Sequence, residues 1–268
     1  MHAAPACEPC APTVPAVPAS PPMPPIARTV HPVAREDAAR RPGARCSSCA
    51  LRHVCLPPGL TREELARIDT VVCTTRPVRR GEILFRIRDA FQSLYIVRTG
   101  SFKTVVMHRD GQEHITGFQI PGDPLGLDGV CAGSHGCEAV ALEDSTVCII
   151  PFGLLERICR ENPRMQRHLY HQLGAEIVRE SGLLMLLGTM TAEQRLASFL
   201  LDLAAHFKAR GYSGTEFNLK MSRAEIGSFL GLTVETVSRM FSRFQREGLV
   251  KPNGKQIRII DAEGLAQV

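Results

Sequence analysis

Two short helices joined by a glycine turn, close to the C-terminus, restrict the fold of this chain more than any other feature of its sequence. Ser222 is the expected N-cap of the first helix, and Glu225 three residues later completes a capping box. This helix should end at Gly231, and Thr233 can cap a second helix from Val234 to about Glu247. Such a pair is typical of the helix-turn-helix, whose second helix enters the major groove of DNA.

A β-hairpin should follow the second helix. The segment from Val250 to Ile260 contains Asn253-Gly254, the pair that favours a type I′ turn. Together these elements predict a winged helix. Residues 218–260 carry eight Lys or Arg side chains and three Glu, a balance of +5, which equals the net charge of the whole chain. This concentration of positive charge predicts a polyanion, double-stranded DNA, as the partner of this unit.

Three side chains near the start of the second helix are candidates for reading DNA bases: Glu235, Ser238 and Arg239. In the major groove Arg binds guanine O6 and N7, Glu accepts from cytosine N4, and Ser contacts either edge. A Glu that faces phosphates is otherwise unfavourable, so Glu235 favours base reading. Phosphate contacts are assigned to five basic side chains, although an ordinary solvated surface explains each equally well: Arg223, Arg243, Arg246, Lys251 and Lys255.

Short β-rich runs separated by turn signals fill the segment from Val71 to Pro151. Runs such as Leu94–Val97 and Val147–Ile150 predict an antiparallel barrel or jelly roll. Residues 1–44, rich in Pro and Ala, should form an extended tail. The sequence therefore predicts an α+β protein in four parts: the tail (1–44), a loop and β-roll domain (45–151), a long helix (152–190) and the winged helix-turn-helix unit (191–268).

The long helix carries an apolar stripe that predicts a two-helix seam between the subunits of a homodimer. Packing of the stripe on the chain's own β-domain is the alternative. Glu180 lies where the stripe expects an apolar residue, and two such carboxylates would repel each other in a symmetric pair. The sequence thus predicts a marginal dimer, unless Arg179 or another nearby base neutralises Glu180. The seam comprises Met165, Leu169, Leu173, Ile177, Glu180 and Leu184, with Leu187 beyond them.

Composition excludes several other classes of protein. Hydrophobic residues make up 44% of the chain, and the longest unbroken apolar run, Leu183–Leu187, is far too short for a membrane span. Prolines interrupt the N-terminus, which lacks the apolar core of a secretory signal, so a cytoplasmic location is expected. The sequence contains no arrangement of Ser, His and carboxylate and no phosphate loop, which disfavours an enzyme.

Three of the ten cysteines form a C-x2-C-x5-C run, Cys46, Cys49 and Cys55, at the junction of tail and β-domain. Thiolates so close together can hold an iron–sulfur cluster or zinc if a fourth ligand comes from elsewhere. Their spacing favours a cluster but leaves zinc and a thiol redox switch open. A second pair, Cys7 and Cys10, has metal-like spacing but lies in the tail and is a weak signal.

Several motifs accompany the cysteine run and the Leu56-Pro57 that follows it: Ser93–Tyr95, His114–Phe118, Val147–Pro151, Ala192–Leu196 and Leu230–Arg239. On these motifs, from about Cys46 to Leu265, the sequence resembles the fumarate and nitrate reduction regulator, FNR, of the cyclic AMP receptor protein superfamily. The resemblance implies a cyclic-nucleotide-binding-like β-roll as sensor domain, a 4Fe-4S cluster on Cys46, Cys49, Cys55 and Cys148, and reading of a TTGAT-type half-site by the three base-reading candidates.

The resemblance further implies an oxygen-responsive regulator that is active under anaerobic conditions. The cluster would promote dimerisation on a two-fold operator, and oxygen would release the DNA. Loops near Thr99 and near Arg109–Gln112 would contact RNA polymerase and allow activation. The alternatives are a zinc- or thiol-dependent regulator of the same superfamily and a metal-stabilised interaction protein that binds no operator.

Cyclic nucleotide is disfavoured as the ligand. In the wider superfamily an Arg holds the cyclic phosphate, but the comparable stretch here, from Gly126 to Glu138, contains no arginine. A phosphate buried without a cation would be unfavourable.

Overall fold

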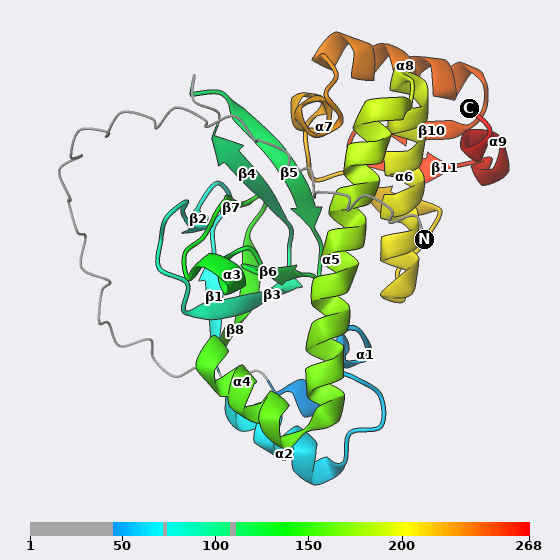
Figure 1. The fold of residues 1–268 in the computed structure, drawn as a ribbon. Coiled ribbons are helices and arrows are strands. Elements are labelled where there is room, and N and C mark those ends of the chain that lie inside the picture. The colour runs from blue at the N-terminus through cyan, green and yellow to red at the C-terminus, as the bar shows by residue number, and fades with distance from the viewer. Residues whose placement is uncertain (1–44, 72–73, 108–110) are drawn as a thin grey trace, which may run out of the picture. The chain divides into compact units, whose positions relative to one another are not determined.

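The computed structural model describes residues 45–71, 74–107 and 111–268 (Figure 1). The tail with Cys7 and Cys10, Cys73, and two residues of the predicted polymerase loop, 109 and 110, lie outside these residues. The described part of the chain begins with a 3₁₀ helix (η1, Cys46–Ser48) and two α-helices, α1 (Arg52–Cys55) and α2 (Arg62–Val71). No helix in it is long and apolar enough to cross a membrane.

The β-domain contains two four-stranded antiparallel sheets within the described residues, which confirms the predicted jelly roll (Figure 1). The first sheet has the order β1 (Thr74–Val78), β8 (Ser145–Pro151), β3 (Ser93–Thr99) and β6 (Pro124–Leu125). The second has the order β2 (Ile83–Phe85), β7 (Glu138–Ala141), β4 (Phe102–Met107) and β5 (Glu113–Gln119). A short helix, α3 (Gly129–Ala132), precedes β7. Inward-facing side chains such as Val97, Phe102 and Val147 are fully buried and form the core.

Helix caps define the helices that follow. Helix α4 (Phe152–Glu161) ends at Asn162, whose side chain accepts from the backbone N–H groups of Arg164 and Met165 and so starts α5 (Pro163–Thr189). Thr191 and Gln194 form a capping box at the start of α6 (Ala192–Ala209). Residues 152–190, predicted as one long helix, therefore form two, because Asn162 ends α4 and caps α5.

The winged unit has the predicted helix-turn-helix. Its helices are α7 (Arg223–Leu230) and α8 (Val234–Arg246), followed by β10 (Val250–Asn253), β11 (Gln256–Ile259) and α9 (Ala262–Ala266); β9 (Glu216–Asn218) completes a three-stranded sheet. Ser222 and Glu225 form the capping box, and Gly231 ends α7 with a left-handed φ of 64°. At Gly227 an added Cβ would lie 2.6 Å from the Leu232 carbonyl oxygen, so glycine allows α7 to approach the turn closely.

The predicted hairpin turn is wrong in its register. Asn253 pairs with Gln256, so Gly254 and Lys255 are the two central residues, and only Gly254 has a positive φ. A type I′ turn centred on Asn253-Gly254 would need positive φ at both of its central residues. Pairing of β11 with both β10 and β9, which buries Ile257 and Ile259, sets the register instead.

Candidate functional site

Helix α8 presents the three candidate base-reading side chains to solvent. Glu235, Ser238 and Arg239 are exposed, whereas Val237 and Phe241 on the opposite face are buried in the core of the winged unit. Ser238 Oγ donates to the Val234 carbonyl at 2.8 Å, and Arg239 Nη2 donates to Thr236 Oγ1 at 3.2 Å. The backbone N–H of Glu235 at the helix start lowers the pKa of its side chain, with a further contribution from Thr233.

The five candidate phosphate contacts differ in their surroundings. Arg246, Lys251 and Lys255 are exposed. Arg243 forms ion pairs with Glu193 and with Glu247, the latter at 2.7 Å, so its charge is already paired within the chain.

Among the five candidates, Arg223 has the most unusual surroundings. Its guanidinium carbon lies 3.2 Å from the centre of the Phe241 ring, and burial lowers its pKa to about 10. One of its guanidinium nitrogens, Nη1, is buried without a hydrogen-bond partner in the described part of the chain. Arg223 is therefore a cation packed between α7 and α8 rather than a solvated surface charge.

The four candidate cluster ligands come from two parts of the β-domain. Cys46 lies in η1, Cys49 follows it, Cys55 ends α1, and Cys148 lies in β8. Burial, and after it the charges of the neighbouring Cys thiols, raise the pKa of the Cys46 and Cys55 thiols to about 12, so the four groups lie within electrostatic range of one another. Burial also raises the pKa of Cys148.

The four thiols are not arranged as a preformed metal-binding site. Within the described ranges, no three His, Cys, Asp or Glu side chains are grouped so that they could hold a metal ion. The donor set nevertheless suits an iron–sulfur cluster, because four half-buried sulfurs are available. Arg98 lowers the pKa of both Cys46 and Cys148, so a positive charge lies beside the place where thiolate charge would accumulate.

Polar and apolar contacts attach the cysteine loop, residues 46–56, to the rest of the β-domain and to α5. Ser47 binds the Asp69 carboxylate of α2 through its backbone N–H (3.1 Å) and its hydroxyl (2.6 Å). The ring of His168 in α5 donates from Nε2 to the Cys55 carbonyl (3.1 Å), and burial lowers the pKa of this imidazole. Leu56 belongs to a buried apolar cluster, and Val54 Cγ1 lies 3.1 Å from where a Cβ on Gly122 would be, beside the turn between β5 and β6. A change in this loop can therefore affect α2, α5 and that turn.

The remaining described cysteines have ordinary surroundings. Cys131 is exposed and Cys159 is buried. Cys137 Sγ lies 3.5 Å from an Asp128 carboxylate oxygen, and burial raises the pKa of this thiol.

The segment comparable to a cyclic-nucleotide site is filled by its own side chains. The Asp128 carboxylate accepts from the backbone N–H groups of Gly136 (2.7 Å) and Cys137 (3.3 Å). The His135 ring is 3% exposed and stacks on Phe85 with ring centres 3.8 Å apart. A phosphate placed here would meet a carboxylate that already uses the backbone donors.

The residues of the predicted α5 seam differ in exposure. Ile177 and Leu184 are 65% and 72% exposed, and Glu180 between them is also exposed. Met165, in contrast, is 4% exposed and belongs to the buried cluster beneath the cysteine loop, against which Leu169 also packs. Met165 and Leu169 therefore do not belong to an exposed seam, and that part of the prediction is wrong. Residues four apart are rotated by about 40° around a helix at each step, so the stripe turns from the core to the solvent-exposed face along α5. Leu173 is half-buried between the two.

Sequence reasoning missed Tyr170, which is 61% exposed and begins a seven-residue series with Ile177 and Leu184. That heptad spacing was the available signal. Arg179 pairs with Glu176 at 3.1 Å, so it does not serve as the predicted neutralising partner of Glu180.

Comparisons with known proteins agree with this architecture. Residues 75–162 match the model of the cyclic nucleotide-binding domain, and residues 194–268 match that of the Crp-like helix-turn-helix domain. The chain is 47% identical to the transcriptional regulatory protein btr of Bordetella pertussis, over 84% of this chain and 93% of that protein. It is 43% identical to the transcriptional activator protein anr of Pseudomonas aeruginosa, over 82% of this chain and 91% of that protein.

One further relative and one solved structure are also similar to this chain. The fumarate and nitrate reduction regulatory protein of Shigella dysenteriae is 38% identical over 83% of this chain and 89% of its own length. Among solved structures, FixK2 of Bradyrhizobium japonicum superimposes with a TM-score of 0.67 at 30% identity, covering 72% of this chain and 96% of that one.

Proposed function

This chain belongs to the FNR-type branch of the Crp-like transcription regulators, and we propose that it is an oxygen-responsive member that holds a 4Fe-4S cluster. The observation that carries the proposal is the cysteine arrangement: three thiols in one short loop and Cys148 on β8, all within electrostatic range. A half-buried set of four sulfurs with Arg98 beside it suits an anionic cluster better than a simple redox pair.

The cluster would be held by Cys46, Cys49, Cys55 and Cys148. When bound, it would supply an oxygen-labile cross-link between the cysteine loop and β8. Other residues of the chain also hold the cysteine loop in place: Asp69 attaches it to α2, and His168 attaches it to α5. In air, loss of the cross-link would leave the loop held by these weaker contacts alone, and the exposed part of the α5 seam would lose its support.

DNA recognition follows from α8. We assign base reading to Glu235, Ser238 and Arg239, and phosphate contacts to the exposed cations Arg246, Lys251 and Lys255. Arg223 and Arg243 are weaker candidates for phosphate contact, because each is engaged within the chain. Crp-family regulators bind DNA and act as dimers, so the operator should be two-fold, with half-sites about 34 Å apart.

The proposal also concerns cyclic nucleotide and RNA polymerase. The β-roll binds no cyclic nucleotide, because Asp128 and His135 occupy the comparable segment and no arginine lies in it. The exposed end of β3 at Thr99 is assigned to RNA polymerase together with the predicted loop near Arg109. The proposal assigns no catalytic role to any residue.

An anaerobic spectrum combined with a gel shift tests the proposal. Protein purified without oxygen should be brown, contain about four iron and four sulfide per chain, and shift a palindromic TTGAT-type operator; exposure to air should bleach it and weaken the shift. A colourless protein with one zinc per chain would support the zinc alternative, and a metal-free protein whose DNA binding responds to thiol oxidants would support a thiol switch. Failure of every form to bind the operator would favour an interaction protein.

Replacement of Glu180 by Ala should tighten the dimer. Glu180 is exposed between Ile177 and Leu184, and no ion pair among the described residues neutralises it. Removing two facing carboxylates from a partly desolvated seam should lower the dimer dissociation constant about tenfold, or about 1.4 kcal/mol. Equilibrium sedimentation without DNA measures the constant.

The matched control is Glu156→Ala, which removes an exposed carboxylate from α4, away from the seam. Equal dissociation constants for Glu180→Ala and the unaltered protein would show that this carboxylate does not oppose association.

A further inference from the structure

The turn that joins β5 to β6, residues 120–123, lies between the cysteine loop and helix α6. Its Gly122 has a φ of 98°, and a Cβ added there would lie 3.1 Å from Cγ1 of Val54 and 3.4 Å from Nε of Arg210. Val54 precedes Cys55 in the cysteine loop, and Arg210 is the C-cap of α6. The space beside Gly122 that a side chain would fill is therefore bordered both by the proposed sensor loop, at Val54, and by the end of the helix that leads into the winged unit, at Arg210.

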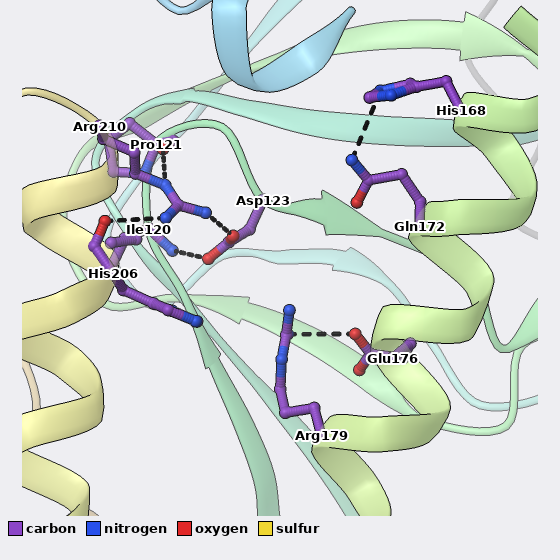
Figure 2. A network of polar contacts seen from close by, with 9 residues as sticks. All are labelled: Ile120, Pro121, Asp123, His168, Gln172, Glu176, Arg179, His206 and Arg210. Atoms are coloured by element: carbon purple, nitrogen blue, oxygen red, sulfur yellow. Dashed lines mark hydrogen bonds and ion pairs between the residues drawn. The ribbon is translucent and has the colours of Figure 1, made fainter. Parts of the chain in front are cut away.

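Arg210 is attached to this turn by several bonds (Figure 2). Its Nε donates to the Pro121 carbonyl at 2.7 Å, and Nη2 forms an ion pair with the Asp123 carboxylate. The second oxygen of Asp123 accepts from the Ile120 backbone N–H at 2.9 Å. A third donor of Arg210, Nη1, binds the His206 carbonyl of α6 itself at 2.9 Å.

Both side chains of the Arg210–Asp123 ion pair are buried. The side chains of Arg210 and Asp123 are 8% and 2% exposed, unlike the exposed pairs elsewhere in the described chain, such as Arg67 with Glu161 at 74% and 56%. Charges out of water are stable only when each hydrogen bond is made, so a small displacement of the turn would leave both groups poorly solvated and poorly paired. The contact is therefore sensitive to the position of residues 120–123.

Helix α6 can pass such a displacement to the DNA-binding surface. Its residues Leu196, Leu200 and Leu203 lie in the same buried cluster as Phe241 and Phe244 of α8. Packed interiors deform little, so α6 and α8 should move together.

We propose that Arg210 is a positioning residue that fixes the winged unit on the turn 120–123, which Val54 of the cysteine loop supports. Oxygen would then weaken DNA binding within a single subunit, in addition to any effect on the α5 seam. The proposal rests on the proposed function, in which the cysteine loop is the sensor. A displacement of Val54 from Gly122 would release the turn, and the Asp123–Arg210 pair would lose its geometry.

A tandem dimer distinguishes an effect of oxygen through the Arg210 contact from an effect through dissociation of the α5 seam. Two full chains joined by a long flexible linker cannot dissociate, so loss of the seam alone should leave operator affinity nearly unchanged. With the pair intact, we expect air to weaken operator binding by the tandem protein about tenfold, within the usual range of coupling between sites. In the tandem Asp123→Asn protein, anaerobic affinity should already be about tenfold lower, and air should change it less than about twofold.

The matched control is a tandem Glu161→Gln protein, which removes the exposed pair with Arg67 and should keep the full air response. Hydrogen exchange gives a readout without DNA: amides at the C-terminal end of α6 should exchange about tenfold faster in Asp123→Asn than in the control. If circular dichroism shows that Asp123→Asn does not fold, Val54→Ala takes its place, and its smaller side chain should reduce the air response in the same way.

Iron content is measured on the same samples. Tandem protein that loses its iron in air and keeps its operator affinity would overturn the Arg210 proposal and leave the cluster proposal standing. An air response as large in Asp123→Asn as in Glu161→Gln would also overturn it. Absence of iron from anaerobic protein would overturn both proposals.

Discussion

Replacement of Cys148 by Ser should yield an anaerobically purified protein that has little colour and binds its operator at least about 100-fold more weakly, or roughly 3 kcal/mol. Cys148 lies in β8, paired with Thr75 on β1 and Ile96 on β3, and is the only proposed ligand outside the cysteine loop. The other three thiols could still gather in the loop, but nothing would join that loop to the sheet. Iron and sulfide analysis, visible absorbance and a gel shift measure the loss.

The matched control is Cys131→Ser, which alters an exposed thiol that is not among the proposed ligands. It should retain iron, colour and operator binding. Anaerobic cofactor content and operator binding that survive in Cys148→Ser would exclude the four-thiol arrangement proposed here. Iron that is retained without operator binding would place Cys148 in signal transfer instead of ligation.

Local signals in the sequence predicted the ends of helices well. The capping box at Ser222 and the helix end at Gly231 are decided by residues a few positions apart, and the structure has both. The overall jelly roll also followed from local runs and turns. The hairpin turn failed because its register depends on a third strand, β9, that pairs with β11 from a distant part of the sequence.

Other features of the candidate site depend on contacts that no local pattern reports. Arg223 resembles a surface charge in the sequence, yet Phe241 of the next helix lies beneath it. The proximity of Cys148 to the cysteine loop was implied only by family resemblance, since spacing within the loop cannot select among five more distant cysteines. Met165 faces the core because the direction of an apolar stripe depends on what the helix packs against.

Arg239→Ala should cost about 1–3 kcal/mol of operator affinity and reduce the preference for the operator over unrelated DNA by the same factor. Arg239 is exposed on α8, and its hydrogen bond to Thr236 holds the guanidinium beside Glu235 near the helix start. A bidentate contact to one base pair discriminates between sequences, so binding to unrelated DNA should change little. Fluorescence anisotropy on operator and scrambled duplexes, each over a series of salt concentrations, measures both quantities.

Lys255→Ala is the matched control, because it removes one exposed cation from the wing instead of from α8. It should weaken binding to both duplexes equally and reduce the dependence of log affinity on log salt by about one ion. Equal losses on the two duplexes for Arg239→Ala would mean that this side chain contacts phosphate. Base reading would then have to rest on Glu235 and Ser238, which together offer one acceptor and one hydroxyl and so discriminate less between sequences.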